Sequence, residues 1–327
     1  MTAADLSQVG DGRPCRVLSI DGGGIRGIVP TIVMAEIERR TGQSASRLFD
    51  LIAGTSTGGI IALGLAMPGA QGEAAWRAEE LIEIYARDGA TMFPPAPLGE
   101  LRAVFHQRYD EAPILALLHG YFGNTALSQA TCDVMVTTYD VVAREALILS
   151  NRHACEDAAF DLPVRVAAHA TAAAPTYFAP VKATFGNPPR ERVLIDGSVF
   201  ANNPSMCAFT EVQRRRYGSN VVVVSLGTGS LTRRYQWDDV SGWGLAHWAR
   251  PLLHIVVDGA GETVDFQLRT MLGEERYHRF QIPLKHASDD LDDASPSNIE
   301  KLREEAQRLI IGQDRELDDV CQQLTDS

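Results

Sequence analysis

The sequence predicts an α/β fold, a three-layer α/β/α sandwich with a largely parallel central sheet. Short apolar segments typical of buried strands alternate with segments of helical periodicity along most of the chain. Two of these apolar segments run directly into glycine-rich turns, at 21–27 and 54–59, and a helix is expected after each turn. Neither a Pro/Ser-rich linker nor a sharp change of composition divides the chain. We therefore expect one domain that covers residues 15–312.

The first half of the chain supplies two strand–turn–helix units. A strand is expected at 15–20, and the helix after its turn begins at Ile28, because apolar residues then recur at roughly helical spacing. A second buried strand is expected at 48–53, again followed by an apolar helix. Residues 68–123 differ, with helical stretches on either side of a proline-rich segment. We expect this region to form a cap beside the functional site.

The second half returns to regular alternation and then becomes mostly helical. The expected elements are strands at 133–141 and 145–151, a helix at 163–174, a strand at 192–197, a helix at 203–218 and a strand at 221–229. The last long helix is expected to begin with a capping box formed by Ser297 and Glu300. The acidic run at 289–293 is interpreted as a solvated loop, and residues 313–327 as an acidic C-terminal tail.

The composition argues against several classes of function. A formal net charge of −12 disfavours binding to a nucleic-acid polymer, because phosphate backbones are held mainly by Lys and Arg. About −8 of this charge lies from Ala287 onward, so the rest of the chain is only mildly acidic and suits contact with a lipid surface. The five cysteines are scattered without C-x-x-C spacing, which indicates neither disulfides nor a metal site. Without a signal pattern or a spanning apolar run, we expect a soluble, cytoplasmic protein.

The segment GTSTG at 54–58 matches the G-x-S-x-G pattern of a nucleophile elbow. A strand is expected before it and a helix after it, which is the setting that the elbow requires. Gly54 and Gly58 are the small neighbours that a serine needs on such a tight turn, and the turn places the hydroxyl at the positive end of the helix. Ser56 is therefore a candidate nucleophile, although a role as a simple helix cap stays open.

The segment DGGGIRG at 21–27 permits three interpretations. Gly22, Gly24 and Gly27 spell G-x-G-x-x-G after a strand, as in a dinucleotide fingerprint, but no acidic residue ends a second strand about 20 residues later. Alternatively, the successive amides of Gly22, Gly23 and Gly24 form an oxyanion hole at a helix N-terminus. In the third interpretation the glycines serve only tight packing.

A serine hydroxyl needs a base to take its proton. None of the histidines stands in a catalytic motif, and His169 lies in an Ala-rich helix, where packing is the commoner role. Asp196 ends an apolar strand and opens a turn with Gly197, at the position where sheet enzymes place reactive groups. By itself such an Asp-Gly pair is more often only a turn, so Asp196 becomes a candidate base through its combination with the other motifs.

In combination, DGGGIRG, GTSTGG and DGS resemble the glycine-rich, G-x-S-x-G and D-G-[GAS] motifs of the patatin family and follow the same order. Further segments that resemble the family are ATAAAPTYFAP at 170–180, ANNP at 201–204, SLGTG at 225–229 and LLHIVVDGAGETVDFQLR at 252–269. The resemblance extends from about Arg16 to the last helix. Two positions depart from it: Ser198 replaces the more frequent glycine or alanine, and His169 stands where arginine is common in bacterial relatives.

The resemblance implies a serine carboxylic-ester hydrolase of the phospholipase A or lysophospholipase type. Carried over by position, Ser56 is the nucleophile, Asp196 its base, and the amides of Gly22 to Gly24 the oxyanion hole, with Arg26 beside them. The reaction would cleave a fatty-acyl ester through an acyl-enzyme, with neither a metal nor a cofactor. The implied partners are a phospholipid or other acyl lipid, a membrane contacted peripherally and, by likeness to some bacterial members, a cyclic-nucleotide activator.

Two other hypotheses stay open. The first is an α/β-hydrolase with a Ser-Asp-His triad, which predicts a histidine whose loss abolishes hydrolysis. The second is a lipid- or nucleotide-binding module without turnover, which has no need of Ser56 and Asp196 together. Bulky residues of the cap region, Phe93 and Tyr121 among them, either line an acyl channel, contact a membrane or only pack.

Overall fold

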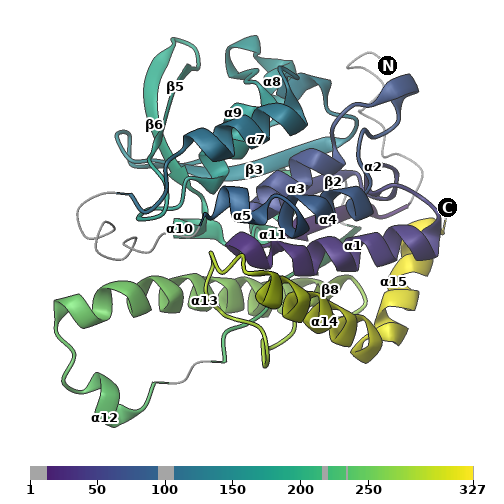
Figure 1. Cartoon of the computed structure of the whole chain (residues 1–327). Helices are drawn as coiled ribbons and strands as arrows, with labels where there is room; N and C mark the ends of the chain where they lie inside the picture. Colours follow the sequence, from purple (N-terminus) through teal and green to yellow (C-terminus); the bar gives the residue numbers. More distant parts are fainter. Residues whose placement is uncertain (1–12, 95–106, 216–219, 233–234, 327) are drawn as a thin grey trace.

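A mixed central sheet with helices on both faces forms the core of the computed structural model, which describes residues 13–94, 107–215, 220–232 and 235–326 (Figure 1). In spatial order the strands are β5 (Val181–Phe185), β6 (Arg190–Asp196), β3 (Asp133–Asp140), β2 (Leu51–Thr55), β1 (Cys15–Ile20), β7 (Val221–Leu226) and β8 (Tyr277–Phe280), with β4 (Glu145–Ser150) also paired to β3. The five strands from β3 to β8 in this order are parallel, whereas β4, β5 and β6 pair antiparallel. The predicted α/β/α class is confirmed, with a mixed sheet.

Helices cover the two faces of the sheet unequally. One face is covered by α1 (Ile28–Thr41), α3 (Thr57–Leu65), α4 (Ala78–Ala86), α7 (Ala112–Phe122), α9 (Val164–Ala172) and α14 (Pro296–Gly312), and the other by α11 (Ser205–Arg214) and α13 (Leu245–Leu272). Shorter elements are η1 (Gly24–Gly27), α2 (Ala45–Leu48), η2 (Ala70–Gly72), α5 (Gly89–Met92), η3 (Leu127–Gln129), α8 (Asn151–Glu156), η4 (Ala158–Phe160), α10 (Ser198–Ala201) and α12 (Trp237–Val240). The last helix is α15 (Asp314–Thr325). In the part of the chain that the structure describes, no helix is long and apolar enough to cross a membrane.

Strand β1 shows how the two cores arise. Alternate side chains of a strand point to opposite faces of the sheet. Leu18 and Ile20 belong to the larger core beneath α1 and α3, whereas Cys15 and Val17 belong to the smaller core beneath α11 and the end of α13. Because both faces are buried, the strand reads as a continuous apolar run, as the sequence suggested.

The pairing of β3 brings two distant parts of the chain together. Parallel β2 pairs with Asp133–Thr137 of β3 and ends with Thr55 opposite Thr137. Antiparallel β6 pairs with the next residues of β3 and ends with Asp196 opposite Thr138. The carboxyl ends of β2 and β6 therefore meet at adjacent residues of β3, although the sequence separates them by more than a hundred residues.

Several expected boundaries were wrong. Strand β2 begins at Leu51 rather than residue 48, because residues 45–48 form the short helix α2. The expected capping box of Ser297 and Glu300 is also wrong, since α14 begins at Pro296, a residue whose fixed φ suits the first helical position. Its cap is Ser295, whose Oγ accepts a hydrogen bond from the Asn298 amide at 3.3 Å. Strands β5 and β8 were not expected.

The acidic C-terminal segments are more ordered than the charge pattern suggested. Residues 314–325 form α15, whose buried Leu317 and Leu324 pack toward α1, so most of the segment expected to be an acidic tail is a docked helix. In the loop at 289–293 the Asp292 carboxylate is buried, and it accepts hydrogen bonds from Tyr109 at 2.6 Å and pairs with Arg108 at 2.9 Å. This loop is therefore not simply solvated.

The expected cap region is joined to the main core. Helices α4, α5 and α7 lie within 68–123, and Leu81, Tyr85 and Phe122 are buried in the same core as α1 and α3. Residues 95–106, which include part of the proline-rich segment, lie outside the described residues. The described part of 68–123 thus forms one wall of the domain.

Candidate active site

Ser56 stands at the junction between β2 and α3 in a strained backbone conformation. Its φ of 55° and ψ of −125° are unusual for a residue with a side chain. The neighbouring glycines permit this turn, because a Cβ on Gly54 would overlap the Gly58 carbonyl and a Cβ on Gly58 would overlap the Ile20 carbonyl. The Ser56 amide donates to Thr171 Oγ1 at 2.9 Å, which fixes the turn to α9. This is the geometry expected of a nucleophile elbow.

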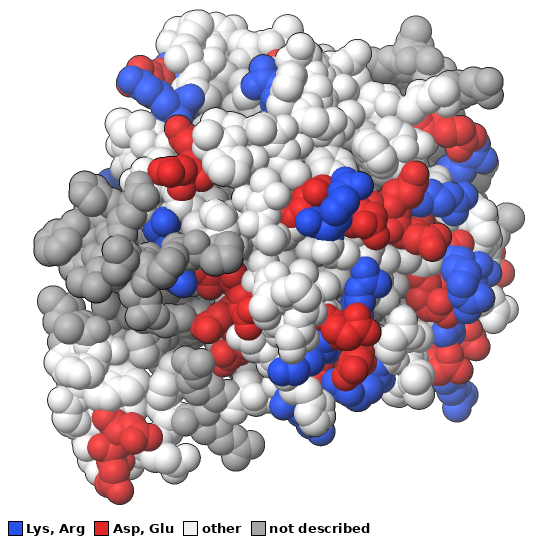
Figure 2. Space-filling model, in the orientation of Figure 1, with Lys and Arg blue, Asp and Glu red and all other residues white. Residues whose placement is uncertain are grey.

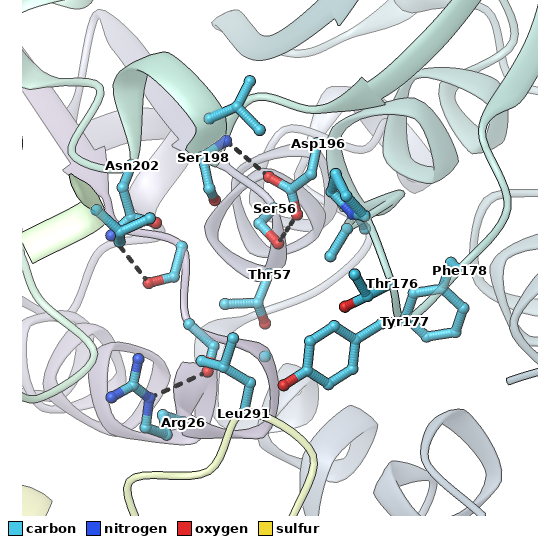
Figure 3. A pocket seen from close by; sticks show the side chains of 18 of the residues that line it. Arg26, Ser56, Thr57, Thr176, Tyr177, Phe178, Asp196, Ser198, Asn202 and Leu291 are labelled. Atoms are coloured by element: carbon cyan, nitrogen blue, oxygen red, sulfur yellow. Dashed lines mark hydrogen bonds between the residues drawn. The ribbon is translucent and has the colours of Figure 1, made fainter. Parts of the chain in front are cut away.

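Asp196 lies in direct contact with Ser56. Ser56 Oγ donates a hydrogen bond of 2.5 Å to Asp196 Oδ2, and the two side chains point toward each other in Figure 3. The other carboxylate oxygen, Oδ1, accepts the Ser198 amide at 2.8 Å, so both oxygens are oriented. Gly197 allows this close turn, because a Cβ there would overlap Thr137 Oγ1.

The environment of Asp196 changes its acidity. Burial removes the carboxylate from water and raises its pKa from 3.8 to about 6, against the opposing effect of the hydrogen bonds from Ser56 and Ser198. A carboxyl group with a pKa near 6 is ionised at neutral pH and accepts a proton more readily than an ordinary aspartate does. The pair is therefore suited to general-base chemistry.

The glycine-rich turn lies beside Ser56, and its three amides are not equivalent. The Gly22 amide donates to the Asn202 carbonyl at 3.0 Å, and the Gly22 carbonyl accepts from Thr228 Oγ1 at 2.8 Å. The Gly23 and Gly24 amides donate to no acceptor among the described residues. Two amides of the turn are thus left for a ligand, whereas the third holds the turn in place.

Arg26 lies on η1 directly after the glycines and is buried. Its Nε donates to the Gly23 carbonyl at 3.3 Å, and its NH1 has no hydrogen-bond partner among the described residues. Burial lowers the pKa of the guanidinium, and the carboxylates of Asp258 and Asp289 oppose that effect. Arg26 thereby holds the peptide between Gly23 and Gly24 and places a positive charge at the pocket wall.

These groups share one pocket of about 530 Å³. Its walls include Gly22, Gly23, Gly24, Arg26, Ser56, Asp196 and residues of α3, α5, α7 and α13. The lining residues Ile60, Met92 and Ile114 are apolar and buried. On α13, His254 is partly exposed and Asp258 is exposed, and both also line the pocket. The pocket therefore has a buried apolar part and a more polar part that is open to solvent beside α13.

The sequence model of the family described as "Patatin-like phospholipase" matches residues 18–208. The chain belongs to the patatin-like phospholipase family. Patatin-like protein 2 of Arabidopsis thaliana is 31% identical over 305 residues, covering 81% of this chain and 75% of that protein. Patatin-like protein 2 of Oryza sativa subsp. japonica is 29% identical (90% and 83% covered), and patatin-17 of Solanum cardiophyllum is 26% identical (94% and 86% covered). In general terms the chain is a lipid acyl hydrolase, as its family is.

Three residues that hold the patatin-like site were not singled out from the sequence. Thr171 bonds the Ser56 amide, Asn202 bonds the Gly22 amide, and Thr228 bonds the Gly22 carbonyl. Each lies in one of the segments 170–180, 201–204 and 225–229 that resemble the family. Polar residues within those segments were the signal that could have found them.

The histidines take no part in the contact between Ser56 and Asp196. His169 is buried on α9, its Nε2 has no partner among the described residues, and burial lowers its pKa. His254 lines the pocket from α13. Since Ser56 Oγ donates directly to Asp196, the position that a triad histidine would occupy is taken by the carboxylate. No group of three or more His, Cys, Asp or Glu among the described residues is placed to hold a metal ion.

The cap-region aromatics divide between pocket and packing. Phe93 lines the pocket and lies near Phe178 and Tyr109, with ring centroids 5.9 Å and 5.8 Å away. Tyr121 donates to Asp88 at 2.8 Å and contacts Trp76, so its role is packing. Of the three alternatives given for these residues, a position along the acyl channel therefore suits Phe93.

Proposed function

We propose that the chain hydrolyses fatty-acyl esters of phospholipids or related acyl lipids with Ser56 as nucleophile and Asp196 as its general base. The observation that carries this proposal is the 2.5 Å hydrogen bond between the two side chains at a strained elbow. A serine is activated when a base within hydrogen-bond reach takes its proton as it attacks. The phospholipase A or lysophospholipase type of reaction follows from the family and the apolar pocket.

The reaction proceeds in two acyl-transfer steps. Ser56 Oγ attacks the ester carbonyl while its proton passes to Asp196 Oδ2, and the tetrahedral intermediate then releases the alcohol, which takes the proton. Water attacks the acyl-enzyme and gives a proton to Asp196, which passes that proton to Ser56 Oγ as the bond between Ser56 and the acyl group breaks and the fatty acid is released. This cycle returns Asp196 to its carboxylate form and needs neither a metal nor a cofactor.

The negative oxygen of each intermediate needs preorganised donors. The Gly23 and Gly24 amides are the donors that the glycine-rich turn leaves available, and Ser56 stands at the N-terminus of α3. Amides in such a turn and the positive end of a helix stabilise an oxyanion. The Gly22 amide was expected to join them, but its bond to Asn202 assigns it to support of the turn.

The two parts of the pocket suit the two parts of a lipid. The buried part formed by Ile60, Met92 and Ile114 accepts an acyl chain, because apolar surface is favourably removed from water there. The polar opening at α13 accepts the alcohol part of the ester. Such a substrate resides in a membrane, so the protein contacts a membrane peripherally while it acts.

The decisive experiment removes the nucleophile. Ser56→Ala is expected to lose covalent labelling by a fluorophosphonate and to reduce hydrolysis of acyl esters by at least about a thousandfold. Ser198→Ala is the matched control: it removes a neighbouring pocket hydroxyl and that hydroxyl's hydrogen bond to Asp196, but it keeps Ser56 and the Ser198 amide that orients Asp196, so labelling should persist. Full activity of Ser56→Ala would refute the proposal, and dinucleotide binding without labelling of the unsubstituted chain would favour a binding module.

The direct Ser56–Asp196 contact also supports a dyad over a triad. His254→Gln changes the histidine that lines the pocket, and we expect a reduction of less than about tenfold in the rate on a dissolved short-chain ester. A loss as large as that of Ser56→Ala would instead assign a histidine to the machinery.

Activation by a cyclic nucleotide rests on the sequence resemblance alone. Hydrolysis should rise when one member of a panel of cyclic di- and trinucleotides is added to the purified chain. Equal activity with every member and with none would count against it.

A further inference from the structure

Helix α13 carries an uncharged stripe along its solvent-facing side. Leu252, Val256, Gly259, Thr263 and Phe266 follow one another at alternating spacings of four and three residues, and all are exposed. This spacing places them on one face of the helix. Leu252, Val256 and Phe266 are 50%, 48% and 70% exposed, and the flanking Ile255 and Met271 are exposed as well. Large apolar side chains that gather in this way on a surface mark a contact site.

The same helix borders the pocket that contains Ser56. His254, Val257 and Asp258 line that pocket, and they lie between or beside the first residues of the stripe. His254 and Val257 are partly exposed and Asp258 is exposed, so the pocket is open to solvent beside this helix. A lipid that enters there passes the N-terminal half of α13. The stripe and the entrance are two adjoining sides of one helix.

Aromatic residues gather just before this part of α13. Three of the four tryptophans of the chain are Trp237, Trp243 and Trp248, all within twelve residues. Trp237 on α12 is 77% exposed. Trp243 contacts both Tyr235 and Trp248 edge to face, with ring centroids 5.1 Å and 5.0 Å away, respectively. Figure 1 shows α12 and the start of α13 projecting from the rest of the molecule. Trp and Tyr are the side chains that favour the boundary between water and lipid.

Charged residues of both signs belong to this region. Figure 2 shows charged side chains of both signs over α1, α14 and α15, and an acidic group over α12, where Asp238 and Asp239 lie. Among the described residues, Asp258 and Glu262 are the exposed acidic residues nearest the stripe on α13. The same segment of the sequence contains Arg233, Arg234 and Arg250, so its charge balance selects neither an anionic nor an uncharged lipid surface. The apolar stripe and the aromatic group are the features that indicate a lipid.

We propose that the stripe of α13, together with the aromatic group before it, docks the protein on a phospholipid surface and presents the pocket opening to that surface. The helix would lie in the boundary layer rather than cross it, as amphipathic interfacial helices do. This inference rests on the proposed function in one respect, that the lipid beneath the stripe is also the substrate. A bilayer supplies substrate to the adjoining opening, whereas a second copy of the chain in the same place does not.

Binding is tested apart from turnover. Ser56→Ala protein is mixed with phosphatidylcholine vesicles and sedimented, with and without the further substitutions Leu252→Gln and Val256→Gln, which keep the helix but make the stripe polar. The double substitution should weaken binding by roughly tenfold to a hundredfold. Ile311→Gln is the control, since Ile311 is 74% exposed at the far end of α14, and it should bind as Ser56→Ala does.

Salt dependence and turnover complete the test. Binding should persist when the salt concentration rises from about 0.1 M to about 1 M, because burial of apolar surface is not screened. In the active chain, Leu252→Gln/Val256→Gln should slow hydrolysis of vesicle phospholipid by at least about tenfold and leave hydrolysis of a dissolved short-chain ester unchanged.

Two results would overturn the docking face. The first is vesicle binding by the double variant equal to that of its parent. The second is a dimer of the parent that becomes a monomer in the double variant, measured by light scattering after size-exclusion chromatography, which would make the stripe an interface between copies. Failure of the active chain on every ester would overturn the proposed function instead, and the sedimentation result would stand independently of it.

Discussion

Ser56 and Asp196 each lower the stability of the fold, and each is used by the proposed reaction. Ser56 occupies a backbone region that costs of order 1–3 kcal/mol for a residue with a side chain. Asp196 is buried, no cation among the described residues pairs with it, and its raised pKa reflects the cost of burying its charge. Both costs in folding free energy therefore fall on the two residues that the proposed reaction uses. The surrounding hydrogen bonds from Thr171 and Ser198 hold this arrangement in place.

The raised pKa of Asp196 predicts the acid limb of the pH–rate profile. Only the carboxylate accepts the Ser56 proton, and its pKa is about 6. On a dissolved ester, kcat/KM should therefore be level at neutral pH and fall about tenfold per pH unit below about 6. Circular dichroism at each pH verifies that the chain stays folded, and a profile that is level down to pH of about 4.5 would exclude Asp196 as the base.

The same shift predicts that Asp196→Asn stabilises the fold. The pKa of Asp196 in the folded chain, about 6, lies above its ordinary value of 3.8. The folded chain is therefore most stable relative to the unfolded chain below pH 3.8, where Asp196 is protonated, and it loses this stability as the pH rises through about 6. An asparagine keeps the neutral form at every pH. At pH of about 8 the variant should unfold at higher urea, with a gain of up to about 3 kcal/mol that vanishes near pH 4. Activity should be lost, and a variant less stable than the parent at pH 8 would contradict the prediction.

At the scale of elements, an ion pair joins the ends of β1 and β8 beneath the glycine-rich turn. Arg279 lies on β8, and its NH2 contacts Asp21 Oδ2 at 2.5 Å while its NH1 contacts Oδ1 at 3.0 Å. Both side chains are almost fully buried, and Asp21 is the residue directly before Gly22. The pair therefore fixes the start of the turn that, in our proposal, supplies the oxyanion donors.

Breaking this ion pair should be costly because the remaining charge stays buried. Arg279→Met is expected to lower the free energy of unfolding by about 3–5 kcal/mol in urea denaturation. The double variant Arg279→Met/Asp21→Asn should recover part of that loss, since no unpaired carboxylate remains. A loss below about 1 kcal/mol for the single variant would mean that water reaches Asp21.

At the scale of the whole molecule, the C-terminal helix closes the core over α1. Helix α15 has a strongly acidic sequence, yet its buried residues Leu317, Val320 and Leu324 follow helical spacing and join the main core. Its Asp314 and Asp318 pair with Arg40 at the surface, each at 2.6 Å. The apolar face, rather than the charge, holds this helix to the domain.

A matched pair of substitutions separates these two contributions. Leu317→Ala should lower the free energy of unfolding by about 2–5 kcal/mol through lost burial and the cavity left behind. Asp318→Ala, one residue further on, removes an exposed ion pair and should cost less than about 1 kcal/mol. Urea denaturation of both variants tests this, and similar losses for both would show that charge pairing dominates the docking of α15.

Local structure was predictable wherever a short pattern encodes it. The first strand was expected at 15–20 and Ile28 at the start of the next helix, and both agree with the structure. The elbow at Ser56 was equally accessible, since a strand, small residues and a helix lie within a few positions of one another. Two features were missed. Helix α14 begins at Pro296, so its N-cap is Ser295 rather than Ser297. Strand β8 has four residues and follows a long helix, and its sequence shows little strand pattern.

The sequence by itself determined which residues we propose for the chemistry, because Ser56, Asp196 and the glycines of 21–27 are recognisable from local motifs and their order. Only the tertiary structure decided how they meet. Antiparallel β6 ends against β3 where parallel β2 has just ended, and this brings Asp196 to Ser56 without a histidine between them. Long-range pairing also assigned the Gly22 amide to Asn202 and left the stripe of α13 exposed beside the pocket. Such contacts depend on which distant surfaces pack together, and no short stretch of sequence encodes that choice.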